Sequence, residues 1–331
     1  MAIRRFPKTG TIAALTLLCV HGVRAQSQDL YVSDSPRGTI DRFTVAADGT
    51  VSNSMVPYIS GQGNPLGIAF DNSGNLYIDD SGGNVVNRVP INSPGSSTPI
   101  ATGFNNPFGN VIGPDGSLFV ANDGDGTVAR VTFNADRSVN TVTQNFLAGF
   151  SNPEGLAFDA AGNLFITNES ANTISEVMAG ATTATTLTAS TLLSGPVGLA
   201  FDAQGNLFVA NSTGNTIDRI TFSSAGSLAT IADTGERNLS GPYGLAFDAM
   251  GALYAADFTG DQNLGGAITR VTLNASGMST GSNLIATGLG NPAFLAFHLT
   301  ATAATPEPGS GALLMVVVLP AMGFVRRRLH R

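Results

Sequence analysis

Several residue types are scarce in this sequence, and each scarcity excludes a kind of chemistry. The 331 residues contain one cysteine, no tryptophan and three histidines. The cysteine, Cys19, lies in an N-terminal apolar run that we expect to be removed, so the remaining chain has no thiol chemistry and no disulfide. His298 is the one histidine between residues 26 and 306, and there is no Gly-x-Ser-x-Gly motif. A serine–histidine triad is therefore excluded.

Lysine is missing from the same part of the chain. Residues 26–306 contain eight arginines and 22 acidic residues, which gives a formal charge of −14. A surface this acidic repels nucleic acid and anionic lipid, so neither is an expected partner. It favours solubility and attracts divalent cations only loosely.

The N-terminus has the composition of a targeting segment. Arg4, Arg5 and Lys8 precede an apolar run at residues 11–20, and small side chains stand at the −3 and −1 positions of a cleavage site after Ala25. This layout predicts a secretory signal peptide over residues 1–25, which signal peptidase removes.

The C-terminus has three parts in a fixed order. They are Pro306, Glu307 and Pro308; the uncharged 17-residue run Gly309–Val325; and the arginines Arg326, Arg327 and Arg328. We expect a linker over residues 301–308, a short transmembrane helix over 309–325 and a basic cytoplasmic tail over 326–331.

This order of parts resembles a PEP-CTERM sorting signal. The resemblance implies a Gram-negative cell, transient anchoring in the inner membrane, and an exosortase that cuts near the Pro-Glu-Pro motif. Length and flanking charge alone also fit an ordinary tail anchor. Either interpretation leaves the body of the protein outside the cytoplasm.

Between its ends the chain repeats one phrase. Copies such as GLAFDAQGNLFVANSTGNTIDRI start at Gly67, Gly109, Gly155, Gly198 and Gly244, which are 42, 46, 43 and 46 residues apart. A sixth copy stops soon after it begins near residue 292, and its missing part stands at residues 29–43. The chain thus holds six units, one of them split between its two ends.

Each unit reads as four short strands joined by Gly, Asn and Asp turns, and no window shows a helical period. Six such units predict an all-β fold over residues 26–300: a six-bladed β-propeller with four-stranded blades. We expect the strand at residues 292–299 to complete the blade that begins at Asp29. That pairing closes the ring and removes the exposed sheet edges.

The repeated pattern Pro-x-Gly-[Leu/Ile]-Ala-Phe-Asp-x-x-Gly-Asn-Leu resembles the NHL repeat and the six-bladed regucalcin and gluconolactonase family. The resemblance covers residues 29–299 and implies the propeller fold. It implies lactonase, lyase or pure binding activity equally well. In the family, a Glu, an Asn and an Asp near the upper mouth of the central tunnel hold a divalent metal, and an Asp acts as the base.

Two sets of repeat positions are expected at the upper mouth of the tunnel. The first set, the residues between Pro and Gly, comprises Leu66, Phe108, Glu154, Val197, Tyr243 and Ala293. Only Glu154 could ligate a metal, and one carboxylate cannot satisfy a hard cation that needs six or more oxygens. The set forms either a mostly apolar small-ligand pocket with Glu154 and Tyr243 as its polar groups, or a filling for the tunnel.

The second set ends the second strand of each unit and comprises Asp34, Asp80, Asn122, Asn168, Asn211 and Asp257. These side chains could form a binding collar, in which Asn122, Asn168 and Asn211 contact a ligand. A structural role explains the pattern better, because Asp and Asn accept hydrogen bonds from backbone amides two residues on and order the loop that follows. Similarly, NDGDGT at residues 122–127 is better explained as a hairpin than as a calcium loop.

These observations predict an exported, surface-sorted propeller that acts as a binding module, and the resemblance to a PEP-CTERM protein implies extracellular polysaccharide or a matrix protein as its ligand. The candidate ligand-binding residues are Glu154, Tyr243, Phe108, Asn122, Asn168 and Asn211. The sequence assigns no catalytic residue and no metal site. The alternative is a lactonase or other hydrolase of the gluconolactonase type, which would use Glu154 and Asn or Asp residues of the upper mouth together with calcium.

Overall fold

The computed structural model describes residues 27–46, 48–51, 56–90, 93, 95–188, 190–223, 226–261 and 265–299. Over these residues the regular structure consists of 24 strands, β1 to β24, and includes no helix long and apolar enough to cross a membrane. The predicted signal peptide, the linker, the transmembrane helix at 309–325 and the basic tail lie outside the described residues.

The strands form six antiparallel sheets of four, which we name blades A to F. Blade A comprises β24 (Pro292–Leu299), β1 (Gln28–Asp34), β2 (Thr39–Val45) and β3 (Val56–Ile59). Blade B comprises β4 (Pro65–Phe70), β5 (Asn75–Asp80), β6 (Val85–Pro90) and β7 (Thr98–Thr102). Blade C comprises β8 (Pro107–Ile112), β9 (Leu118–Asn122), β10 (Thr127–Phe133) and β11 (Val139–Ala148).

The other three blades follow the same order along the chain. Blade D comprises β12 (Pro153–Phe158), β13 (Leu164–Asn168), β14 (Thr173–Val177) and β15 (Thr185–Thr188). Blade E comprises β16 (Pro196–Phe201), β17 (Leu207–Asn211), β18 (Thr216–Phe222) and β19 (Leu228–Asp233). Blade F comprises β20 (Pro242–Phe247), β21 (Leu253–Asp261), β22 (Gly265–Leu273) and β23 (Ser279–Leu289).

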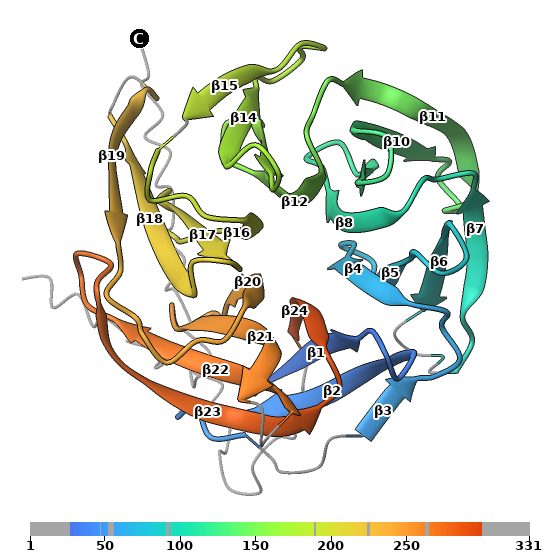
Figure 1. Ribbon diagram of the computed structural model, residues 1–331. Helices are drawn as coiled ribbons and strands as arrows, with labels where there is room; N and C mark the ends of the chain where they lie inside the picture. Colours follow the sequence, from blue (N-terminus) through green and yellow to red (C-terminus); the bar gives the residue numbers. More distant parts are fainter. Residues whose placement is uncertain are drawn as a thin grey trace, which may run out of the picture. The chain divides into compact units, whose positions relative to one another are not determined.

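The innermost strands β4, β8, β12, β16, β20 and β24 each contact the next, and β24 contacts β4, so the ring is closed (Figure 1). Closure depends on the split blade A, in which β24 pairs antiparallel with β1 from Gln28↔Leu299 to Asp34↔Pro292. The six-bladed all-β fold and the closing strand at residues 292–299 are therefore confirmed.

Aromatic pairs join neighbouring blades. An aromatic residue of a blade's second strand meets a Phe at or near the end of the inner strand of the next blade. Five interfaces have such pairs, with ring centroids 4.9–5.2 Å apart in edge-to-face arrangement: Tyr31–Phe70, Phe119–Phe158, Phe165–Phe201, Phe208–Phe247 and Tyr254–Phe297. The repeated Ala-Phe-Asp and Leu-Phe/Tyr segments thus supply the core between blades.

The Asp-x-x-Gly-Asn segments form identical turns at the lower end of the inner strands. In blade B, Asp71 Oδ1 accepts hydrogen bonds from the backbone N–H groups of Ser73 (2.8 Å) and Asn75 (2.9 Å). Gly74 stands between them at a φ of 80°, which a residue with a side chain rarely adopts. The turn reverses the chain so that the second strand returns to the upper end.

The glycine of Pro-x-Gly has a different role, because it lets neighbouring inner strands approach closely. A Cβ added to Gly155 would lie 2.0 Å from the carbonyl oxygen of Val197 in the next blade, and one on Gly198 would lie 2.1 Å from that of Tyr243. These positions have ordinary φ values, so space rather than backbone conformation requires glycine.

Replacing Gly155 by alanine is therefore expected to lower the free energy of unfolding by about 3 kcal/mol or more, because the β12 and β16 backbones would have to separate. Gly83→Ala is the matched control, since a Cβ there meets nothing closer than 3.4 Å. Its effect should stay within about 1 kcal/mol. Urea denaturation measures both; equal effects of the two substitutions would contradict the close-approach explanation.

Candidate functional site

The first set of repeat positions comes together at the upper end of the central tunnel. Each inner strand begins with its Pro opposite an Asp or Asn of the second strand, and a register shift follows in every blade. This Asp or Asn ends the second strand in five blades and lies within β21 in blade F. The residues after the Pro then meet in one apolar cluster, the mouth cluster, made of Leu66, Phe108, Val197, Ala293, Tyr243, Phe258 and Phe294. Four of its members are buried, so the cluster fills this end of the tunnel.

Phe294 and Phe258 belong to the mouth cluster but were not among the sequence candidates. Phe294 occupies the glycine position of the degenerate sixth unit, and its ring lies 5.9 Å from that of Phe108. Phe258 stacks on Tyr243 with centroids 4.2 Å apart and an interplanar angle of 11°. The last unit has Phe294 where the other units have the glycine of Pro-x-Gly, and this difference in the sequence could have indicated that Phe294 belongs to the mouth.

Glu154 is the one acidic residue among the first set of positions, and it is 7% exposed. Its Oε2 has no hydrogen-bond partner among the described residues. Burial raises the pKa of Glu154 well above its ordinary value, and the negative charges of Glu169 and Asp123 raise it further. A carboxyl group in this environment is held in its neutral form to higher pH than an exposed one.

The two neighbouring carboxylates have amide and hydroxyl partners. Asp123 accepts hydrogen bonds from the side-chain amides of Asn106 and Asn152, both at 2.7 Å. Ser170 donates to Oδ1 of Asn152 (2.7 Å) and lies 3.1 Å from Oε2 of Glu169. Within the part of the chain that the structure describes, no group of three or more His, Cys, Asp or Glu side chains is arranged to hold a metal ion.

Tyr243 shares this electrostatic environment. Burial raises the pKa of its phenol to about 12, and Glu154, Glu169 and Asp123 add to the shift in that order. The tyrosine therefore stays protonated, and its ring serves as an apolar surface stacked on Phe258.

The side chains of the second set of repeat positions form hydrogen bonds with the loops above the inner strands. In each blade the side-chain oxygen accepts from a backbone N–H of the loop that precedes the inner strand. Asn122 accepts from Asn105 (3.4 Å), Asn168 from Ser151 (3.3 Å) and Asn211 from Ser194 (3.1 Å); Asp34, Asp80 and Asp257 do the same with Gly290, Gly63 and Ser240. These oxygens thus order the preceding loop, and Asp80 Oδ1 also accepts from the Gly83 N–H (3.4 Å) of the following loop, the one that the sequence pattern suggested.

The three asparagine side chains also donate hydrogen bonds. Asn211 Nδ2 donates to Asp218 Oδ2 (3.0 Å), and Asn168 Nδ2 donates to Ser175 Oγ (2.9 Å). Asn122 Nδ2 donates to Thr127 Oγ1 (3.1 Å), across the turn that joins β9 and β10. The NDGDGT segment forms this β9–β10 turn, as expected of a hairpin.

In some blades the residue that precedes the second-set position connects two inner strands through hydrogen bonds. Thr167 Oγ1 accepts from the Gly155 N–H (2.7 Å) and donates to the Val197 carbonyl of the next blade (2.8 Å). Ser33 makes the equivalent pair of bonds in blade A. Asp79 occupies this position in blade B, so a carboxyl group stands where the other two blades have a hydroxyl.

Asp79 is fully buried, and neither of its oxygens has a hydrogen-bond partner among the described residues. A Cβ on Gly67 would lie 2.4 Å from Asp79 Oδ2 and 2.7 Å from the Phe108 carbonyl oxygen, so the carboxyl group lies between these two strands. Burial raises the pKa of Asp79 well above its ordinary value, although the Asn110 side chain acts in the opposite direction. A protonated Asp79 can donate to a strand carbonyl as Thr167 does.

Because the folded state keeps the Asp79 proton that the unfolded chain loses near pH 4, this group's contribution to stability is complete below pH 4 and is lost as the pH rises through the folded pKa. Asp79→Thr should therefore raise the free energy of unfolding at pH 8 and do so less at pH 4. Thr167→Val, the control, should lower it by about 1–2 kcal/mol at both values. Thermal melts at the two pH values test this, and a pH-independent effect of Asp79→Thr would contradict it.

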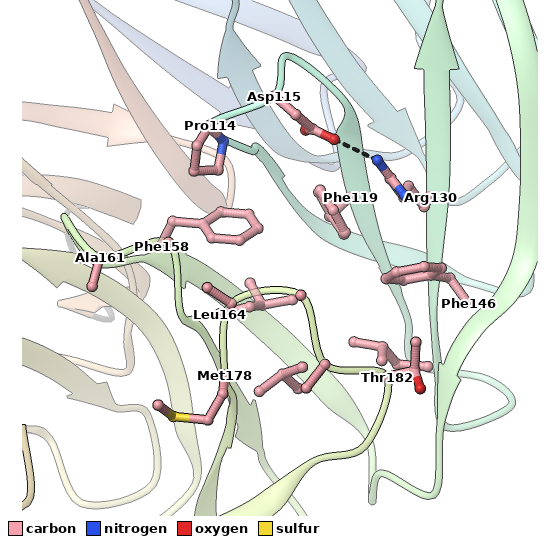
Figure 2. Close-up of a pocket in the computed structure, with 16 residues that line it drawn as sticks. Pro114, Asp115, Phe119, Arg130, Phe146, Phe158, Ala161, Leu164, Met178 and Thr182 are labelled. Carbon is pink, nitrogen blue, oxygen red and sulfur yellow. Dashed lines mark hydrogen bonds and ion pairs between the residues drawn. The ribbon is translucent and has the colours of Figure 1, made fainter.

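A pocket that the sequence did not indicate lies at the lower end of the interface between blades C and D. It has a volume of about 470 Å³ and is lined mainly by Phe119, Arg130, Phe146, Phe158, Ala161 and Met178 (Figure 2). The figure shows the Asp115–Arg130 ion pair at one end of the pocket and Met178 at the other. An apolar pocket with one ion pair at its rim suits a ligand that has an apolar part and a polar group.

The comparisons with known proteins extend over most of the chain. The model of the virginiamycin B lyase family matches residues 21–262, and no curated protein matches. Among solved structures, a chain of a nidogen/laminin complex has 17% identity and a TM-score of 0.65, covering 82% of this chain and 98% of that chain. At these identities a structural likeness shows the fold alone.

Two similar structures are bacterial enzymes. A catalytically inactive His→Ala variant of virginiamycin B lyase from Staphylococcus aureus, crystallised with quinupristin, has 17% identity and a TM-score of 0.54, covering 84% of this chain and 93% of that chain. The periplasmic gluconolactonase of Pseudomonas aeruginosa has 15% identity and a TM-score of 0.60, covering 82% and 99%. The family match, which spans more than half of the sequence, shows that this six-bladed propeller belongs to the virginiamycin B lyase family.

Proposed function

We propose that the chain is an exported propeller that binds extracellular polysaccharide or a matrix protein and does not catalyse a reaction at its tunnel mouth. The observation that carries this proposal is the mouth cluster, whose packed apolar side chains occupy the position where a propeller enzyme of this type would need polar groups. The cluster leaves Glu154 as the one acidic residue of the ring, and burial favours its neutral form.

The position of the histidine also supports binding rather than lyase chemistry. The catalytically inactive relative from Staphylococcus aureus carries alanine in place of a histidine. In this chain, His298 lies opposite Asp29 near the lower end of β24, and its ring is 4.8 Å from that of Phe70. A base at that end of the strand cannot reach a substrate held at the upper mouth.

The two ends of the sequence support export. A signal peptide over residues 1–25 and the Pro-Glu-Pro, apolar and arginine parts of the C-terminal segment would send the propeller across the inner membrane and present it to an exosortase. Replacing Arg326, Arg327 and Arg328 together by alanine is expected to prevent C-terminal processing, so that a longer protein accumulates in the membrane fraction. Immunoblotting of cell fractions measures this; unchanged processing would count against the sorting signal.

One observation favours a second candidate, a calcium-dependent lactonase. Glu154 has a buried oxygen without a partner, and Asp123 and Glu169 lie close enough to raise its pKa. Three carboxyl groups near the upper mouth are the kind of ligand that calcium prefers. Among the described residues they do not form a group that could hold a metal ion, and two amides already bond to Asp123, so this candidate requires the three groups to move together.

Calcium titration by calorimetry separates the two candidates. The binding proposal predicts weak, multi-site binding from diffuse surface charge, with the same isotherm for the wild-type protein and for Glu154→Gln, and no hydrolysis of gluconolactone. Glu176→Gln, which removes an acidic group far from the mouth, is the control. One tight site that Glu154→Gln abolishes and Glu176→Gln preserves, together with lactone hydrolysis, would establish the enzyme instead.

A further inference from the structure

The pocket between blades C and D occupies a position that part of the protein itself fills at other blade interfaces. Five blades carry an arginine at the same point of their third strand: Arg42, Arg88, Arg130, Arg219 and Arg270. The Nη1 atom of Arg88 donates to the backbone carbonyl of Arg137, and Nη1 of Arg219 donates to that of Ser276 at 2.7 Å. In each case the carbonyl belongs to the hairpin between the third and fourth strands of the next blade.

At a third interface a hairpin also packs against the arginine of the preceding blade. Arg270 of blade F lies under the hairpin at residues 46–50 of blade A, where a Cβ added to Gly49 would lie 2.7 Å from Cζ of Arg270. The hairpins of blades A, C and F therefore each cover the arginine of the preceding blade. All three follow a third strand of at least seven residues; five residues separate the third and fourth strands in blades C and F, and in blade A the Val45–Val51 bridge closes the turn.

Blades B and D depart from this rule, because their third strands β6 and β14 have six and five residues and seven residues lead from each to the fourth strand; blade D has the shorter strand. In blade D, β14 ends at Val177, and residues 178–184 lead to β15. The strand is two residues shorter than β10 of blade C, so the chain turns away before it reaches the position that the other hairpins occupy. Residues of this loop, Met178 to Thr182, form the far wall of the pocket instead.

Arg130, the arginine that blade D should cover, consequently has a different set of contacts. It forms an ion pair with Asp115 through Nη2, and its Nε donates to Ser117 Oγ at 3.3 Å. Its guanidinium carbon lies 5.3 Å and 5.7 Å from the ring centroids of Phe146 and Phe119. Its Nη1, the atom that holds a carbonyl in Arg88 and Arg219, has no hydrogen bond among the described residues.

We propose that this pocket binds a peptide segment of a partner protein, which presents a backbone carbonyl to Nη1 of Arg130 and an apolar side chain to Phe119, Phe146 and Phe158. The occupant takes the place of the missing hairpin, so its chemistry follows from the hairpins that fill the other interfaces. This inference rests on the proposed binding function and selects, within it, a matrix protein rather than a polysaccharide.

The form of the pocket favours a peptide. The Phe119 ring meets Phe146 and Phe158 edge-to-face at interplanar angles of 68°, so these rings form an apolar recess around a side chain instead of one flat surface for a sugar ring. Met178 is 56% exposed at the rim, and its flexible thioether can adapt to different apolar side chains.

A second hollow, of about 300 Å³, continues the path of an extended ligand. It lies between the outer parts of blades C and D, is lined by residues 147–150 and 182–186 together with Ser175, and shares Leu147 and Thr182 with the pocket. Its backbone and threonine hydroxyl groups suit the polar main chain of a peptide that leaves the pocket.

The test uses the full-length protein and a small probe, N-acetyl-4-fluorophenylalanine methylamide, observed by fluorine NMR. The probe has the carbonyl and the apolar ring that the pocket is proposed to recognise. Ala161→Trp fills the pocket from the exposed Asp-x-x-Gly-Asn turn of blade D, and Gln204→Trp places the same side chain on the equivalent turn of blade E. Arg130→Gln removes the carbonyl donor, and Arg219→Gln is its control.

Saturable binding is expected, with the dissociation constant raised about tenfold or more by Ala161→Trp and by Arg130→Gln and unchanged by the two controls. Equal thermal melts of wild-type protein and Ala161→Trp verify folding. Absence of saturable binding, or binding that Ala161→Trp leaves intact, overturns the inference. So does binding of cellobiose without binding of the peptide probe, an outcome that leaves the proposed binding function standing. That function fails separately, in the calcium and lactone measurement.

Discussion

The close approach of six inner strands around one axis is the constraint on which the rest of this structure depends. At Gly109 and Gly155 the backbone of one strand lies so near the carbonyl of the next that a Cβ would come within 2.0 Å of it. Closure of the ring by β24 holds the strands at this distance, because its pairing with β1 joins the two ends of the chain in one blade and leaves no gap between the first and last units. The glycine of Pro-x-Gly thus recurs for packing, not for chemistry.

The same crowding determines the character of the upper mouth. Side chains that point into so narrow a ring meet one another, and the apolar ones form the mouth cluster. Charged groups there lose their hydration, which is why Glu154 and Asp79 have raised pKa values. A tunnel of this kind is a poor place for a hard cation and a good place for a packed core.

Differences between the blades create the pocket beside Arg130, which lies away from the tunnel mouth. Where the hairpin of one blade reaches the arginine of the preceding blade, as at Arg88 and Arg219, a backbone carbonyl satisfies the guanidinium and the interface is filled. Where β14 ends early, the same surface remains as a pocket beside Arg130. A repeat protein can therefore acquire a binding site by shortening one strand, with no change to the residues that hold the ring together.

The sequence by itself determined the six blades, the closing strand at residues 292–299 and the gathering of Glu154, Tyr243 and Phe108 at one end of the tunnel, because a repeat places equivalent positions on equivalent strands. Only the tertiary structure decided which groups meet across blades. The Phe294 ring beside Phe108, the preceding loops whose N–H groups donate to the second set of side chains, and the uncovered Arg130 all depend on distances between different repeats. The period of a sequence does not encode those distances.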